Sequence, residues 1–156
     1  MPLAVVASRA LAGIDATEVT VEVHLGPGLP AFNVVGLPDA EVREAKDRVR
    51  AALNQGGFEF PARRITVNLA PADLPKDSSR FDLPMALGIL AASGQLKPAS
   101  LSGHEFAGEL SLTGDLRPVR GALAMALGAE RLGRSFVLPV QNAQQAALVA
   151  GAQIGR

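Results

Sequence analysis

The chain of 156 residues contains no cysteine, tryptophan or tyrosine, and only two histidines, His24 and His104. Without cysteine it cannot form a disulfide framework, a thiolate nucleophile or a cysteine-ligated metal centre. Two isolated histidines do not supply a zinc site. The formal net charge is zero, and no run approaches the roughly 20 apolar residues of a membrane span. We therefore expect a cytoplasmic protein with no membrane partner and no metal site.

Aliphatic side chains make up most of what is present. Hydrophobic residues account for 48% of the chain, but aromatic residues for only 4%, so the core must be built from Ala, Val, Leu and Ile. Apolar and polar residues alternate over residues 18–25, which predicts a strand with one buried face. Residues 3–10 and 31–36 are also rich in strand-forming side chains. We expect these three strands to form an antiparallel meander.

The hydrophobic period changes after residue 37. Pro38 and the acidic residues after it favour the start of a helix that ends at Gly56. The remaining predicted elements are a strand over 65–69, a helix over 82–93, a hairpin around 113–115, a helix over 120–132, a strand over 135–139 and a helix over 142–149 with Asn142 as its cap. This order indicates one α+β domain.

One stretch, PKDSSRFDLPMALGILAASG at residues 75–94, resembles the rim of an active site followed by a core helix. A serine nucleophile needs a histidine or a desolvated lysine as its base. Of the three lysines, Lys46 lies on an exposed helix face, Lys97 lies in a loop, and Lys76 is next to Asp77, which holds its ammonium charged. Neither GxxxxGK[ST] nor GxGxxG occurs, so no phosphate-binding loop is predicted.

The run from residue 36 to residue 96, which begins GLPDAEVREAKDRVRAAL and contains PARRITVNLAPADLPKDSSRFDLPMALG, resembles the N-terminal part of the ComM/YifB family of magnesium-chelatase-like AAA+ ATPases. The resemblance implies a fold like the proteolytic domain of Lon protease and like ribosomal protein S5 domain 2, with a mixed sheet packed with helices. It implies that residues 1–156 are a single Lon-like domain, an N-terminal fragment that lacks the motor domain. Members of this family are hexameric, DNA-binding ATPases that drive branch migration in natural transformation. ATP and magnesium are then expected in the missing motor, and no cofactor in this fragment.

The similarity to Lon also locates the two positions of its catalytic dyad. Lon proteases carry a run like PKDGPSAG, and a gap-free alignment with residues 75–85 places Arg80 on the nucleophilic serine. The lysine that serves as the Lon base follows a second run, which residues 113–123 match, and Leu123 falls on that lysine. A guanidinium cannot attack and an alkyl group cannot accept a proton, so we expect no enzymatic activity of this fragment.

Two roles are open for the residues around Arg80. The first is structural, with Arg80 and Asp82 forming an ion pair that holds the loop onto the helix. The second is a basic rim that contacts DNA phosphates, formed by Arg63, Arg64, Lys76 and Arg80. The resemblance favours a module whose partners are its own AAA+ domain and neighbouring subunits of a hexamer. Two alternatives remain, a peptidase that uses Ser79 with Lys97, and an S5-like RNA-binding module.

Overall fold

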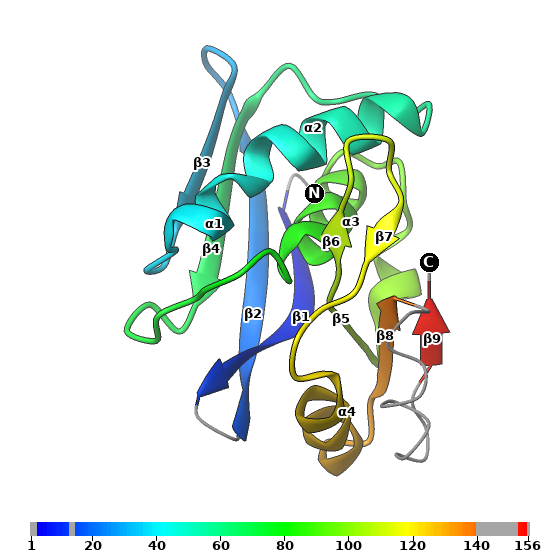
Figure 1. The fold of residues 1–156 in the computed structure, drawn as a ribbon. Coiled ribbons are helices and arrows are strands. Elements are labelled where there is room, and N and C mark those ends of the chain that lie inside the picture. The colour runs from blue at the N-terminus through cyan, green and yellow to red at the C-terminus, as the bar shows by residue number, and fades with distance from the viewer. Residues whose placement is uncertain (1–2, 13–14, 140–152, 156) are drawn as a thin grey trace.

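A seven-stranded mixed sheet organises the chain, in the order β3-β4-β2-β1-β5-β8-β9 (Figure 1). The computed structural model describes residues 3–12, 15–139 and 153–155. The strands are β1 (Leu3–Ala12), β2 (Asp15–Gly26), β3 (Ala31–Val35), β4 (Arg64–Ala70), β5 (His104–Phe106), β8 (Ser135–Pro139) and β9 (Gln153–Gly155). A second sheet contains only β6 (Glu109–Leu110) and β7 (Leu116–Arg117), which form the hairpin predicted around residues 113–115. The α+β class and the mixed sheet are confirmed.

The predicted meander is wrong in its third strand. β1 and β2 form a long antiparallel hairpin, but β3 pairs in parallel with β4, and β4 lies between β3 and β2. The reason is burial. Every second residue of β4 is fully buried, from Ile65 through Val67 to Leu69, whereas only Phe32 is buried in β3. β4 therefore takes the inner position, and the helical crossover between the two strands makes them parallel.

Four α-helices accompany the sheet in the described part of the chain, namely α1 (Ala40–Arg43), α2 (Ala45–Gln55), α3 (Asp82–Ala92) and α4 (Ala122–Arg131). The single helix predicted after Pro38 is thus divided into α1 and α2 at Glu44. Asp39 caps α1 by accepting a hydrogen bond from the Val42 amide at 2.9 Å. The predicted helix over 142–149, with its cap Asn142, lies outside the described residues. No helix among the described residues is long and apolar enough to cross a membrane.

The helices lie on opposite faces of the sheet. A Cβ added at Gly88 of α3 would lie 2.5 Å from Val23 and 3.5 Å from Val6, so α3 packs closely on β1 and β2. A Cβ added at Gly128 of α4 would lie 2.8 Å from the guanidinium of Arg9. Val6 and Arg9 are three residues apart on β1, and side chains at odd spacing point to opposite faces. α4 therefore covers the second face, at the end away from α2 (Figure 1).

Candidate functional site

The loop that precedes α3 meets the segment that precedes α4. Here a hollow of about 410 Å³ is lined by Glu41, Ser78, Ser79, Arg80, Glu109, Pro118, Val119 and Arg120. Arg80 Nη1 donates to the Arg120 carbonyl at 2.9 Å and to Met125 Sδ at 3.2 Å. Leu123 lies between these two residues in the first turn of α4 and is 37% exposed. The two positions that the resemblance to Lon pairs are thus connected through Arg120 and Met125, but Leu123 itself lines a separate hollow with Leu127.

Arg80 is a buried part of the structure, with only 1% of its surface exposed. Its Nε donates to Ser78 Oγ at 3.0 Å, while Nη2 has no acceptor among the described residues. Burial lowers the pKa of Arg80, and although Asp77 acts in the opposite direction, Arg120 lowers it further. No ion pair joins Arg80 to a carboxylate in the described ranges. Arg80 is therefore a buried cation with no direct carboxylate partner among the described residues.

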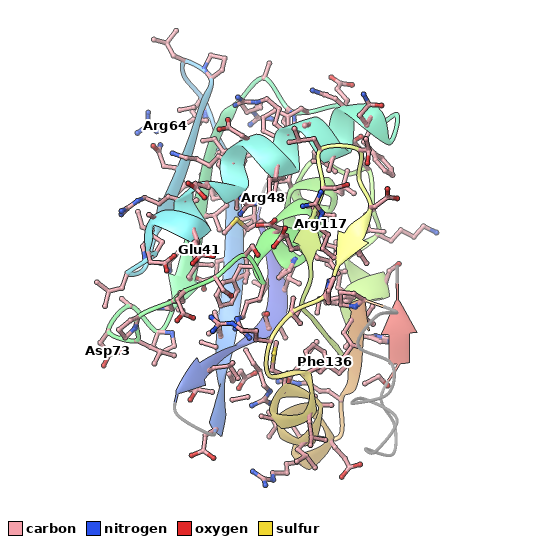
Figure 2. All side chains as sticks on the ribbon, viewed as in Figure 1. Glu41, Arg48, Arg64, Asp73, Arg117 and Phe136 are labelled. Carbon is pink, nitrogen blue, oxygen red and sulfur yellow. The ribbon has the colours of Figure 1, made fainter. Side chains whose placement is uncertain are left out.

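The predicted Arg80–Asp82 pair is wrong, because Asp82 binds Arg48 of α2 instead. Arg48 Nε lies 2.6 Å from Asp82 Oδ2 and Nη2 lies 3.1 Å from Oδ1. The Leu110 amide also donates to this fully buried carboxylate, at 3.0 Å. Burial raises the pKa of Asp82, and the Arg48 hydrogen bonds counteract it. Figure 2 shows Arg48 extending from α2. The pair joins α2 to the first turn of α3.

The serines and lysines do not form a peptidase pair in the described part of the chain. Ser79 donates to a carboxylate oxygen of Glu109. The Lys76 side chain is fully buried and its ammonium donates to the Pro71 carbonyl. Burial lowers the pKa of Lys76, and the charge of Asp73 opposes this effect. Lys97 follows the C-terminal end of α3 whereas Ser79 precedes its N-terminal end, and eleven helical residues span about 16 Å. The predicted Ser79–Lys97 pair is therefore not formed.

The four predicted DNA contacts do not form one rim. Lys76 and Arg80 are buried, whereas Arg63 and Arg64 are exposed at the start of β4. Arg64 and Ala70 lie at opposite ends of this strand, about 20 Å apart at roughly 3.3 Å per residue. Figure 2 shows Arg64 and Asp73 far apart along β4. The spacing in the sequence hides this separation because an entire strand lies between the two pairs of basic residues.

Arg63 instead belongs to a different basic group. It lines a hollow of about 250 Å³ together with Arg50 and Phe60. The Arg50 guanidinium stacks 4.9 Å from the centre of the Phe60 ring. Two arginines and an aromatic ring thus meet beside β3, at the same end of β4 as Arg64.

A buried ion network was not predicted from the sequence. Arg9 binds both carboxylate oxygens of Glu105, at 2.7 and 2.9 Å, and also donates to the Gly128 carbonyl at 2.9 Å. Arg134 contacts Glu105 at 3.1 Å and also pairs with Glu18. Arg9 is 6% exposed and Glu105 is fully buried. The sequence did contain a sign of this pair. Arg9 and Glu105 each lie next to apolar residues in a predicted or short strand, and buried charges usually occur in pairs.

The chain is similar in sequence to several known proteins. Residues 21–142 match the family described as subunit ChlI of Mg-chelatase. The chain is 55% identical over 149 residues to the competence protein ComM of Haemophilus influenzae, covering 96% of this chain and 29% of that protein. It is 48% identical over 151 residues to the uncharacterized protein YifB of Escherichia coli, covering 97% of this chain and 30% of that protein. A Lon protease of Chloroflexus aurantiacus is 29% identical over 131 residues, or 78% of this chain and 16% of that protein.

Proposed function

Because the chain belongs to the ChlI family of Mg-chelatase subunits and resembles ComM and YifB over nearly its whole length, we propose that it is a non-catalytic, Lon-protease-like assembly module of a ComM-type AAA+ protein. The chain spans about three tenths of the length of these relatives, 29% of ComM and 30% of YifB. In this proposal, ATP hydrolysis with its magnesium, hexamer formation and DNA branch migration belong to the whole protein. The module contributes contacts to the AAA+ domain and to neighbouring subunits.

The burial of Arg80 at the nucleophile position is the observation that carries the proposal. Its guanidinium is held by Ser78, the Arg120 carbonyl and Met125, so it occupies the space around which a catalytic dyad would be built. Leu123 supplies no proton acceptor at the second position. Ser79 donates to a carboxylate and not to the histidine or lysine that activates a serine. The buried Arg80 and the aliphatic Leu123 both support a non-catalytic role.

We expect the whole protein to leave unfolded casein intact, and Ser79→Ala to behave as the wild type in the same assay. Removing residues 1–156 is expected to lower the number of subunits per oligomer. This number is obtained by dividing the mass measured by light scattering, with ATP present, by the mass of the shortened subunit. Casein cleavage that disappears in Ser79→Ala would overturn the non-catalytic role. An unchanged oligomer without this module would overturn the assembly role, so the two parts of the proposal fail separately.

The group formed by Arg50, Phe60 and Arg63 favours DNA contact as a second function. Guanidinium groups bind phosphates, and an aromatic ring with a stacked arginine provides a platform for an unpaired base. Arg64 is exposed at the same end of β4 and adds a third positive charge. The zero net charge of the chain limits this function to a local patch.

Replacing Arg63 and Arg64 together by alanine is expected to weaken binding to forked DNA. If each contacts one phosphate, the slope of log affinity against log salt falls by about 2. Fluorescence anisotropy over a range of salt concentrations measures this slope, and Arg131→Ala, an exposed arginine at the end of α4, is the matched control. Equal slopes for all three proteins would exclude the patch. Tighter binding to RNA than to DNA at equal salt would instead favour the S5-like RNA-binding alternative.

A further inference from the structure

Arg80 carries a buried positive charge that forms no ion pair in the described part of the chain. It is 1% exposed, it forms no ion pair with a described carboxylate, and its Nη2 has no hydrogen-bond acceptor there. Its three bonds go to a hydroxyl, a carbonyl and a thioether, all of which are neutral. Buried charges in proteins are normally paired, because leaving water without a counter-ion costs several kcal/mol. Among the described residues, Arg80 therefore has no carboxylate in direct contact with its guanidinium.

The hollow beside Arg80 contains further donors. Ser78 Oγ accepts from Arg80, which leaves its own proton free to donate. Arg120 lies on the wall of the same hollow with an exposed side chain. α3, a helix of eleven residues, begins at Asp82, so the positive end of its dipole is directed toward the preceding loop. Two arginines and a hydroxyl thus border one space.

We propose that this hollow binds the phosphate group of a small ligand, with Arg80 and Arg120 as its cationic contacts and Ser78 as a hydroxyl donor. Three donor residues suit the oxygens of a phosphate better than the two of a carboxylate, and arginine binds phosphate with two parallel hydrogen bonds. About 410 Å³ accommodates a phosphate with a small organic group attached.

The same hollow is unfavourable for a nucleic-acid backbone. Glu41 and Glu109 lie on its wall and would repel an extended polyanion, whereas a single phosphate can be held near Arg80 and Arg120. This ligand class therefore goes beyond the DNA patch proposed around Arg63, which lies at the other end of β4. The two sites can be tested with separate variants.

The test is a titration of the 156-residue chain with inorganic phosphate at constant ionic strength, followed by thermal unfolding and by calorimetry. Phosphate is expected to raise the melting temperature of the wild type in a saturable way. Arg80→Met is expected to remove this response, and Arg120→Met to weaken phosphate binding about tenfold, as the loss of one charge-assisted hydrogen bond does. Arg131→Met, at an exposed arginine at the end of α4, is expected to respond as the wild type does.

Each other outcome contradicts the proposal in a defined way. An equal response to sodium chloride and phosphate in all four proteins shows a salt effect and no site. Tighter binding of acetate than of phosphate, dependent on Arg80, shows a carboxylate site. Tighter binding of a single-stranded oligonucleotide than of phosphate, again dependent on Arg80, shows a nucleic-acid site. Should Arg80→Met fail to fold, Arg120→Met decides, since its side chain is exposed and its loss leaves the buried contacts of Arg80 to the Arg120 carbonyl intact.

Discussion

Replacing Glu105 by glutamine is expected to lower the free energy of unfolding by about 3 kcal/mol, because the buried guanidinium of Arg9 then loses the carboxylate that it binds through two hydrogen bonds. Arg9 contacts both oxygens of Glu105, and the pair is shielded by α4 where Gly128 approaches it. Glutamine offers one acceptor in place of two and directs an NH₂ group toward a cation. Urea unfolding followed by far-ultraviolet circular dichroism is the suitable measurement, since the chain has no tryptophan.

Two further variants separate the buried pair from surface electrostatics. Glu18→Gln removes a partner of Arg134 at the surface, where the glutamate side chain is 40% exposed, and is expected to cost under about 1 kcal/mol. Replacing Arg9 by methionine and Glu105 by leucine together is expected to recover most of the loss, because no unpaired charge remains. A Glu105→Gln protein as stable as Glu18→Gln would show that the buried pair contributes little.

Replacing Arg48 by methionine is expected to cost about 2 kcal/mol at neutral pH, because the fully buried carboxylate of Asp82 keeps only the Leu110 amide as a described partner. The same urea measurement checks this. Arg43→Met on the neighbouring helix α1 is the matched control, since Arg43 is exposed and donates only to the Pro38 carbonyl. Equal stabilities of the two variants would contradict a structural role for the pair.

The cost of Arg48→Met is expected to depend on pH. Burial already raises the pKa of Asp82, and removing the Arg48 hydrogen bonds and charge raises it further. The folded variant then binds a proton at a pH where the unfolded chain does not, so its free energy of unfolding rises as the pH falls through the raised pKa toward the ordinary range of aspartate. The difference from the wild type is therefore largest at neutral pH and shrinks in acid. A difference that grows in acid would assign the effect to another group.

Strands and buried helices could be predicted from the sequence wherever the apolar residues follow a regular pattern. The pattern from Val19 to Leu25 predicted β2, and the apolar run after Asp82 predicted α3, because burial on one or all sides leaves a readable period. The partner of β3 could not be predicted. A period of two identifies a half-buried strand but carries no information about which strand lies beside it.

The candidate site could be located from the sequence but its contacts could not be predicted. Alignment with Lon paired Arg80 with Leu123, but in the fold Arg80 lines one hollow and Leu123 lines another, beside Leu127. The arginine that pairs with Asp82 is determined by how α2 packs on α3. This packing brings Arg48 to Asp82, in place of the expected Arg80. The burial of Lys76 was equally hidden, because a lysine beside an aspartate in a proline-rich loop is typical of a solvated segment.

The link between β1 and β5 has a consequence for how the protein is made. Arg9 and Glu105 are 96 positions apart in the chain, although their side chains are in contact. At about 5 to 20 residues per second, the ribosome needs about 5 to 20 s to add that length. The first hairpin, β1 with β2, therefore leaves the exit tunnel well before its arginine has a partner. During that interval it exposes both a cation without its carboxylate partner and a strand edge of β1 that later pairs with β5.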